Sequence, residues 1–195
     1  MSKADRTRQF IIETAAPIFN KKGVAGTSIS DIMEATHLAK GGVYGNFENK
    51  DQICLEVFNY LAKSLCDAIN KSLAGKTTAK EKLFALFNFY KDRLFKSNSG
   101  GCPILNFGTE ADDTNPVIKD RVKEAIETSQ SRIAGLVKLG IVDGEFKATF
   151  DGETFAVKAF AMIEGAIMIS RVQSSNHQMV LITDLLKAEI EENSN

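Results

Sequence analysis

Hydrophobic residues recur every three or four positions along most of this chain, and alternating, strand-like patterns of any length are missing. The first periodic segment, residues 3–22, places Phe10, Ile11, Ala15 and Phe19 on one stripe and ends at a glycine after two lysines. Further helices are predicted at residues 29–35, 39–47, 49–73, 78–96, through Phe107 to about 113, 116–139, 153–173 and 177–192. The pattern therefore predicts an all-α protein.

Residues that favour helix ends support these boundaries. Ser28 is followed three positions later by Asp31, and Thr78 by Glu81, and both pairs are typical of capping boxes. Asn115 followed by proline is typical of an N-cap with proline at the first helical position. The last two helices are joined only by residues 174–176, so we expect them to lie antiparallel.

Charge is distributed unevenly along the 195 residues. The formal net charge is -1, so the protein has no overall positive field to hold nucleic acid or an anionic membrane. Residues 1–50 carry 7 Lys and Arg against 5 Asp and Glu, whereas the remainder has a net charge of -3. A DNA site, if present, is expected near the N-terminus. No apolar run reaches the roughly 20 residues that cross a bilayer, and no secretory signal is recognised, so a cytoplasmic protein without a membrane partner is expected.

The chemistry of an enzyme is missing from the sequence. Three widely spaced cysteines form no CxxC pair, and His37 and His177 lie far apart without metal-ligand spacing. No nucleophile elbow and no phosphate-binding glycine loop after a strand occur. We therefore expect neither catalysis nor a metal or cofactor.

Two short helices joined by the turn 36–38 have the lengths of a helix-turn-helix, although such spacing also occurs in ordinary helix packing. Residues 23–53 make the assignment specific, because they resemble the DNA-binding domain of the tetracycline-repressor (TetR) family of bacterial transcription regulators. The residues that carry the resemblance, in register and without a gap, are Gly23, Thr27, Ser28, Ile32, Ala35, Leu38, Lys40, Gly41, Tyr44, Phe47, Lys50 and Ile53.

The resemblance implies a three-helix DNA-binding domain at residues 1–50 and an effector-binding and dimerisation domain at residues 51–195. It also implies a division of roles on double-stranded DNA. Phosphate contacts fall to Ser28, Tyr44 and Lys50. Base-edge contacts fall to Ser30, Lys40 and Asn46, while Gly41 and Gly42 let the backbone approach the bases. Arg6 and Arg8 are expected to form an arm to the DNA backbone or minor groove.

The sequence departs from the family pattern at the reading segment. His37 stands where the family commonly has glycine, so a left-handed conformation with some strain is expected there. Ala39 replaces a usual serine and removes a side-chain cap. Gly41, Gly42 and Gly45 weaken one short helix, so DNA shape is expected to contribute to specificity alongside direct readout.

Apolar residues of the remaining chain are candidates for an effector pocket. The expected lining residues are Phe84, Phe87, Tyr90, Cys102, Phe107, Phe160 and Met162, although plain core packing is an alternative at each. Cys102 follows two glycines and precedes a helix, which also suits a thiol that senses electrophiles or oxidants.

The last two helices are expected to form a four-helix interface with a second copy, although packing in the core of a single chain is the alternative. The residues expected to pack there are Ala156, Ala159, Phe160, Ile163, Gly165, Ala166 and Ile167 of the first helix and Met179, Ile182, Leu186 and Ile190 of the second. The predicted function is a ligand-responsive regulator, a repressor that binds a palindromic operator as a dimer and is released by a small molecule. The alternatives are a helical small-molecule carrier without DNA activity and a Cys102 sensor with the same DNA output.

Overall fold

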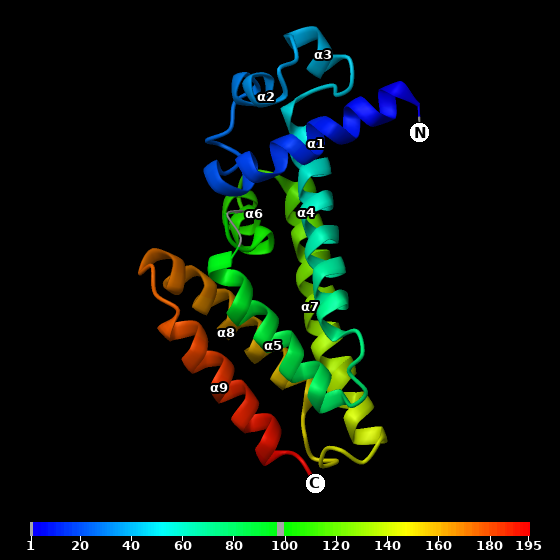
Figure 1. Cartoon of the computed structure of the whole chain (residues 1–195), viewed down its shortest axis with the longest axis vertical. Coiled ribbons are helices and arrows are strands. Elements are labelled where there is room, and N and C mark those ends of the chain that lie inside the picture. Colours follow the sequence, from blue (N-terminus) through cyan, green and yellow to red (C-terminus); the bar gives the residue numbers. More distant parts are fainter. Residues whose placement is uncertain (1, 97–99) are drawn as a thin grey trace. The chain divides into compact units, whose positions relative to one another are not determined.

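The computed structural model describes residues 2–96 and 100–195, and within that part the protein is helical apart from turns and one isolated β-bridge between Phe146 and Ser194 (Figure 1). The predicted all-α fold is confirmed. The described helices are α1 (Lys3–Lys22), α2 (Ile29–Thr36), α3 (Lys40–Tyr44), α4 (Lys50–Leu73), α5 (Ala79–Lys96), α6 (Pro103–Ala111), α7 (Pro116–Val142), α8 (Gly152–Val172) and α9 (His177–Glu192).

Most predicted boundaries are confirmed within one or two residues, and two differ for a physical reason. Helix α3 is shorter than expected, because the Gly45 amide closes it on the Gly41 carbonyl and a turn follows. Helix α7 continues past Gly140, where a stop was predicted. A side-chain carbon at Gly140 would lie 2.3 Å from the Phe146 ring, so the glycine serves close packing rather than helix termination.

The chain divides into two compact units that the linear order does not reveal. The first unit contains residues 1–65 and 99–123, and the second contains residues 66–98 and 124–195. Helices α4 and α7 each contribute residues to both units. The first unit therefore includes the predicted DNA-binding residues together with α6, which follows them by some fifty residues in the sequence.

The first unit is built around α1. Its fully buried side chains include Phe19 and Ile32, through which α1 and α2 pack, and Phe47 just beyond α3. Phe58 of α4 and Phe107 of α6 place their ring centroids 5.3 Å apart. Such burial of large aromatic side chains supplies most of the stabilisation of a small helical unit.

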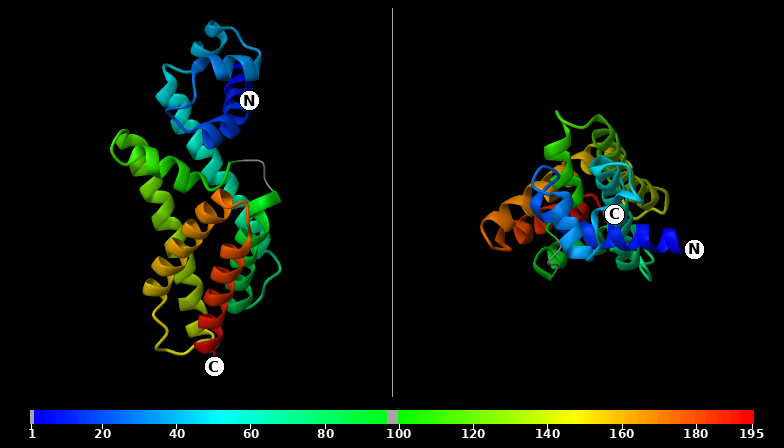
Figure 2. Two further views of the ribbon diagram at one scale, coloured as in Figure 1. Left: turned by 90° about the vertical axis from the view of Figure 1, so that its left-hand side faces the viewer. Right: turned by 90° about the horizontal axis from the view of Figure 1, so that it is seen from above.

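The second unit packs α5, α8 and α9 around a row of aromatic rings. Ring centroids are separated by 6.3 Å between Phe87 and Phe155, 5.1 Å between Phe155 and Phe150, and 5.7 Å between Phe150 and Phe146. Helices α8 and α9 run antiparallel side by side, as their short link predicted (Figures 1 and 2).

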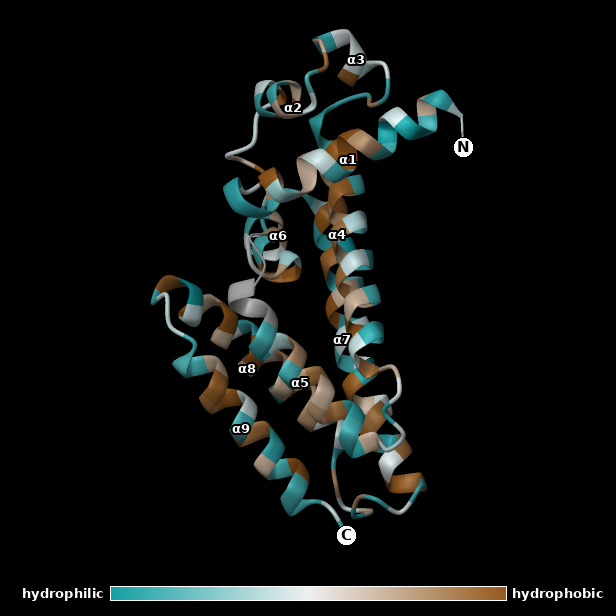
Figure 3. Cartoon of the chain, viewed as in Figure 1, coloured by the Kyte–Doolittle hydropathy of each residue, from teal (hydrophilic) through white to brown (hydrophobic). Residues whose placement is uncertain are grey.

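Burial corrects part of the predicted dimer surface. The small residues Ala156, Ala159 and Ala166 of α8 are buried within a single chain, as are Met179 and Leu186 of α9. The same holds for Ile163, Ile167 and Ile190. The prediction that these side chains pack against a second copy is therefore wrong, because their surface is already covered. Both helices also carry hydrophobic residues on other faces (Figure 3).

No helix in the described part of the chain combines the length and the hydrophobicity needed to cross a membrane.

Candidate nucleic-acid interface

The N-terminus of α2 is fixed by a reciprocal capping box. The Ser28 hydroxyl oxygen accepts a hydrogen bond from the Asp31 amide at 3.1 Å, and the Asp31 carboxylate accepts one from the Ser28 amide at 2.7 Å. Lys22 contacts the same carboxylate at 2.5 Å. The Lys22 ammonium and the Ser28 hydrogen bonds hold the pKa of Asp31 well below its usual range. Exposed Ser28 and Ser30 thus sit on a preorganised helix end.

The turn between α2 and α3 has the conformation that the sequence predicted. His37 adopts φ 56° and ψ 26°, which is the left-handed region that favours glycine. The buried Thr36 hydroxyl donates to the Ile32 carbonyl oxygen at 2.6 Å and closes the end of α2. The turn therefore sets the angle between the two helices through local hydrogen bonding, with the His37 ring exposed.

Helix α3 presents a short polar face over a firm anchor. Val43 is fully buried, whereas Lys40 and Gly41 are exposed and Tyr44 keeps 40% of its surface. The Lys40 ammonium lies 5.8 Å from the centre of the Tyr44 ring. As predicted, Ala39 supplies no side-chain cap. Buried Val43 packs α3 against the rest of the first unit and leaves its exposed residues available to contact DNA.

Asn46, predicted to read a base, is partly engaged within its own helix end. Its side-chain nitrogen donates to the Gly42 carbonyl oxygen at 2.8 Å. Its backbone carbonyl accepts a hydrogen bond from Arg8 at 2.5 Å. Reading a base with the amide group would require the first bond to break, so Lys40 and Ser30 are the freer candidates for base contacts.

Arg8 holds the end of α3 and is not an extended arm. Besides its bond to the Asn46 carbonyl, its guanidinium pairs with Glu56 of α4 at 2.9 Å and lies 4.2 Å from the centre of the Phe47 ring. One side chain of α1 thus joins α3 to α4. Arg6, which is exposed, is the remaining candidate for the arm. Sequence reasoning missed this role because the partners lie 38 and 48 residues away.

Arg8→Ala and Arg6→Ala should separate the two roles. We expect Arg8→Ala to lower the free energy of unfolding by about 2 kcal/mol, because it removes a charge-assisted pair and a stacked aromatic contact. Arg6→Ala should leave the free energy of unfolding unchanged. It should reduce the slope of the logarithm of the DNA-binding constant against the logarithm of the salt concentration by about one, which corresponds to one lost phosphate contact. Urea unfolding and DNA titration at several salt concentrations measure both effects. Equal loss of stability in the two variants would contradict the assignment.

Helix α6 is fastened to α1 by a pair of asparagines. The Asn106 amide nitrogen lies 2.9 Å from the Asn20 carbonyl oxygen, 3.0 Å from the Asn20 side-chain oxygen and 2.9 Å from the Gly100 carbonyl oxygen. Asn20 is buried, and its side chain donates to the Gly101 carbonyl oxygen. The segment that begins α6 is therefore part of the first unit, together with the predicted DNA-binding residues.

The other end of α6 holds the loop that leads into α2. The Glu110 carboxylate accepts hydrogen bonds from the amides of Val24 at 3.0 Å and Ala25 at 2.9 Å. Gly23 adopts φ 76°, and a side-chain carbon there would lie 2.0 Å from a Glu110 oxygen. Glu110 thereby positions the loop before Ser28. No local sequence pattern identifies it, because the contact spans 85 to 86 residues.

Glu110→Ala is expected to weaken DNA binding about tenfold, although the Glu110 side chain itself is not expected to contact DNA. Loss of two charge-assisted hydrogen bonds should also lower the free energy of unfolding by about 2 kcal/mol and speed hydrogen exchange at Val24 and Ala25. DNA titration and exchange measurements test this. Asp113→Ala, which removes an exposed carboxylate from the turn just after α6, is the matched control. Unchanged exchange at both amides would rule out the positioning role.

The predicted effector residues are divided between the two units. Cys102 and Phe107 lie in the first unit, where Phe107 packs on Phe58. The others lie in the second unit, where Phe87 is fully buried against Phe155 and Tyr90 contacts Phe89 at 5.5 Å. Phe84, Phe160 and Met162 are half-buried. Phe87 and Phe107 therefore contribute to core packing, whether or not they also face a ligand.

The cysteines differ sharply in accessibility. Cys54 is fully buried, and burial followed by the charge of Asp51 raises the pKa of its thiol to about 12. Cys102 exposes 6% of its surface, which weighs against the ready access that an electrophile sensor needs. Cys66 is half-buried, and its sulfur lies 2.9 Å from a guanidinium nitrogen of Arg132.

Comparison with known proteins agrees with this geometry. Residues 11–57 match the family described as "Bacterial regulatory proteins, tetR family", and residues 79–185 match "Tetracyclin repressor-like, C-terminal domain". A TetR transcriptional regulator from Chloroflexus aurantiacus has 35% identity and a TM-score of 0.94, with 100% of this chain and 98% of that chain covered. A TetR-family regulator from Cytophaga hutchinsonii has 36% identity and a TM-score of 0.92 at the same coverage.

Curated relatives point the same way. An uncharacterised HTH-type transcriptional regulator of Mycobacterium tuberculosis is 26% identical across 96% of this chain and 97% of its own length. The probable acrEF/envCD operon repressor of Escherichia coli is 40% identical over 57 residues, which cover 29% of this chain and 26% of that protein.

These features define a helix-turn-helix DNA-binding protein: Val43 is buried, the turn at His37 is left-handed, and the opposite face of α3 is exposed. More narrowly, the chain belongs to the TetR family of transcriptional regulators, since the two family matches together cover well over half of its length.

Proposed function

We propose that this protein is a dimeric repressor that binds a near-palindromic operator and releases it when a small molecule binds the second unit. The observation that carries the proposal is the exposed face of α3, on which Lys40 and Tyr44 stand over buried Val43. Two such faces, about 34 Å apart, would meet successive major grooves of one DNA duplex. A repressor that binds a chromosomal operator would act in the cytoplasm.

An apolar surface on α8 and α9 supports the dimer. Met168 and Val172 of α8 and Val180, Leu181 and Leu185 of α9 each leave more than a third of their surface exposed, and Val172 reaches 78%. Several large apolar side chains exposed on two neighbouring helices are costly in water and are typical of a protein interface. We therefore assign the dimer contact to these side chains in place of the buried residues that the sequence suggested.

Release by a small molecule is a population shift. Consider a ligand that binds the conformation in which the two α3 helices have the wrong spacing for DNA. Its affinity for that conformation must be about a hundredfold higher than for the DNA-binding conformation if most operator sites are to be released. The effector need not touch DNA, because it acts only through the equilibrium between the two conformations.

Selection of bound sequences from a random DNA pool with the purified protein tests the proposal. Enrichment of an inverted repeat, together with a dimeric mass in sedimentation equilibrium, is expected. A protein that stays monomeric and enriches no sequence even at low salt would refute it, as would the behaviour of a helical carrier, which binds small molecules but not DNA.

Lys40→Ala and Tyr44→Phe test the division between reading and positioning. Lys40→Ala should relax base preference, because it removes a donor to base edges. Tyr44→Phe should weaken operator and random DNA alike, about tenfold, because it removes one hydrogen bond from a hydroxyl to a charged phosphate. Titration against the selected operator and a scrambled duplex measures both. Loss of the same discrimination in the two variants would contradict these roles.

A further inference from the structure

Cys66 of α4 and Arg132 of α7 meet within the second unit, in a contact that neither the DNA interface nor the dimer surface uses. The Arg132 nitrogen Nη2 donates to the Cys66 sulfur across 2.9 Å, and the Asn70 side-chain nitrogen donates to the same sulfur across 3.8 Å. Two N–H donors thus converge on one sulfur atom. A neutral thiol is only a weak hydrogen-bond acceptor, so this arrangement suits a sulfur group that carries negative charge.

The Arg132 guanidinium also has a buried donor that is not used. Its second terminal nitrogen, Nη1, is covered by the protein and has no hydrogen-bond partner, and Cys66 is the one printed partner of Nη2 among the described residues. A buried donor without an acceptor costs the desolvation of that group, and the cost is larger when the group is charged. An acceptor placed beside the Cys66 sulfur would remove this cost.

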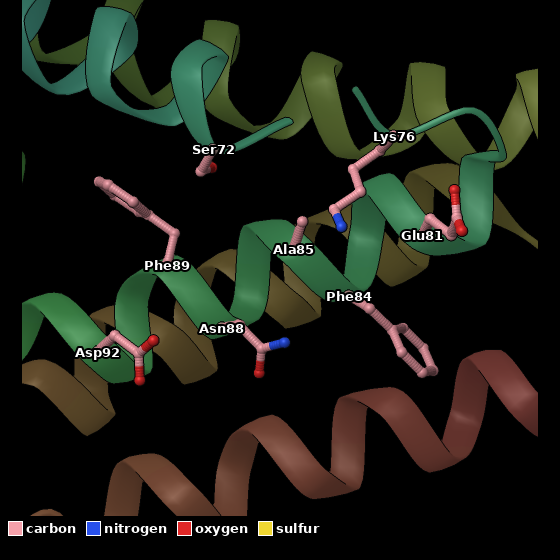
Figure 4. Close-up of a pocket in the computed structure, with 8 residues that line it drawn as sticks. All are labelled: Ser72, Lys76, Glu81, Phe84, Ala85, Asn88, Phe89 and Asp92. Atoms are coloured by element: carbon pink, nitrogen blue, oxygen red, sulfur yellow. The ribbon is translucent and has the colours of Figure 1, made fainter. Parts of the chain in front are cut away.

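The positive charge of Arg132 is not balanced by an ion pair with a carboxylate in the described part of the chain. The charge of Lys76 is in a different situation. Lys76 lines an open hollow along α5 whose lining also contains two carboxylates, those of Glu81 and Asp92 (Figure 4). The guanidinium charge therefore remains available to stabilise an anion that forms at the Cys66 sulfur, because opposite charges attract strongly where the surroundings are partly buried.

Cys66 is also the most accessible of the three cysteines. It is half-buried, whereas Cys54 is fully buried and Cys102 exposes 6% of its surface. Access to solvent and a neighbouring positive charge are the two properties that distinguish cysteines that are readily oxidised from cysteines that only pack.

We propose that Cys66 is a site of oxidation by hydrogen peroxide and that Arg132 stabilises the product. The Cys66 thiolate, formed when the thiol loses its proton to solvent, attacks one peroxide oxygen. The S–O bond forms as the O–O bond breaks, and the sulfur loses two electrons to the peroxide. The second oxygen takes the proton of the transferred oxygen and leaves as water, so the product is a sulfenate.

The added oxygen supplies the acceptor that the Arg132 side chain lacks. Nη2 already contacts the sulfur, and an oxygen bonded to that sulfur can accept a hydrogen bond from Nη1. The two parallel N–H groups of a guanidinium suit an anion with two adjacent acceptor atoms. The site uses residues of the second unit alone, so it stands independently of the DNA-binding proposal, and either can fail without the other.

The test treats the full-length protein with hydrogen peroxide and measures the loss of each free thiol over time by mass spectrometry, with dimedone added to trap sulfenic acid. We expect the Cys66 thiol to be lost about tenfold faster than those of Cys54 and Cys102, and to carry the dimedone adduct. In urea the three rates should become similar, because the folded surroundings are lost. Equal rates in the folded protein, or no adduct at Cys66, would overturn the proposal.

Arg132→Gln tests the role of the guanidinium. It should slow the loss of the Cys66 thiol about tenfold in the folded protein and have no effect in urea. Arg132→Lys keeps the charge and should be slowed less. The control is Arg121→Gln, which removes the same charge from an exposed position of α7 and should leave the rate unchanged. Thermal melting checks that each variant is folded. A wild-type rate at Cys66 in folded Arg132→Gln would refute the assigned role of Arg132.

Discussion

Leu185→Glu is expected to leave the protein monomeric and to lower its operator affinity about a thousandfold. Leu185 exposes 51% of its surface beside Leu181 at 46%, on the α9 face that we assign to the dimer. A carboxylate there would be buried without a partner if two copies associated. A monomer binds only one half-site, and linking two sites raises affinity by about 10² to 10⁴ through effective concentration alone.

Sedimentation equilibrium and titration with the selected inverted repeat measure the two effects. The control is Val142→Glu, which places the same charge at a residue exposed by 75% at the end of α7 and should stay dimeric. Val142→Glu should melt like the wild-type chain, and Leu185→Glu should keep the helical circular-dichroism spectrum of a folded chain, because neither position belongs to the core. A dimeric Leu185→Glu, or a monomer that binds the operator normally, would sink the assignment of this surface.

Gly41→Leu should stabilise the protein and yet weaken DNA binding about a hundredfold. The space around Gly41 is empty in the protein itself, since a side-chain carbon built there meets nothing within 4 Å. A glycine in a helix costs up to about 1 kcal/mol relative to a good helix former, so replacement should raise the free energy of unfolding. Nothing within the chain requires a glycine here, and we infer that the DNA does.

The distinctive result is that the free energy of unfolding rises while the affinity for DNA falls. A leucine on the exposed face of α3 would stand between the backbone and the bases that we expect Lys40 and Ser30 to contact, and Gly41→Ala should have an intermediate effect. Gly135→Leu is the matched control, because Gly135 also lies within a helix with empty space around it. It should gain stability without losing DNA affinity. Normal operator binding by Gly41→Leu would show that the backbone does not approach the DNA closely.

Local structure was largely predictable from the sequence. The capping boxes at Ser28 and Thr78, the left-handed conformation of His37 and the missing cap at Ala39 are each decided by a few neighbouring residues. The resemblance over residues 23–53 then identified the helix-turn-helix. The predicted roles of the DNA-contacting side chains stay predictions, although Asn46 is less free than its position in the motif suggested.

Other features failed to appear in the sequence because their partners are distant along the chain. Gly140 reads as a helix stop, but only the packing of Phe146 shows that it lies inside α7. Ala156 and Ala159 have the composition of a close-packed dimer surface, yet they are covered within one chain. Helical periodicity shows which residues are apolar, but a helix with more than one apolar face does not reveal which of them another helix of the same chain will cover.

The sequence by itself determined the helices, their caps and the reading segment, because hydrogen bonds within a turn or a cap join residues only three or four positions apart. Only the tertiary structure shows that α6 belongs to the first unit, through the contacts of Asn106 and Glu110. It also shows that Arg8 stabilises the end of α3 by donating a hydrogen bond to the Asn46 carbonyl oxygen. It also decided which faces of α8 and α9 stay open. The placement of α6 and the role of Arg8 depend on contacts that span from 38 to more than 80 residues, and no local pattern encodes them.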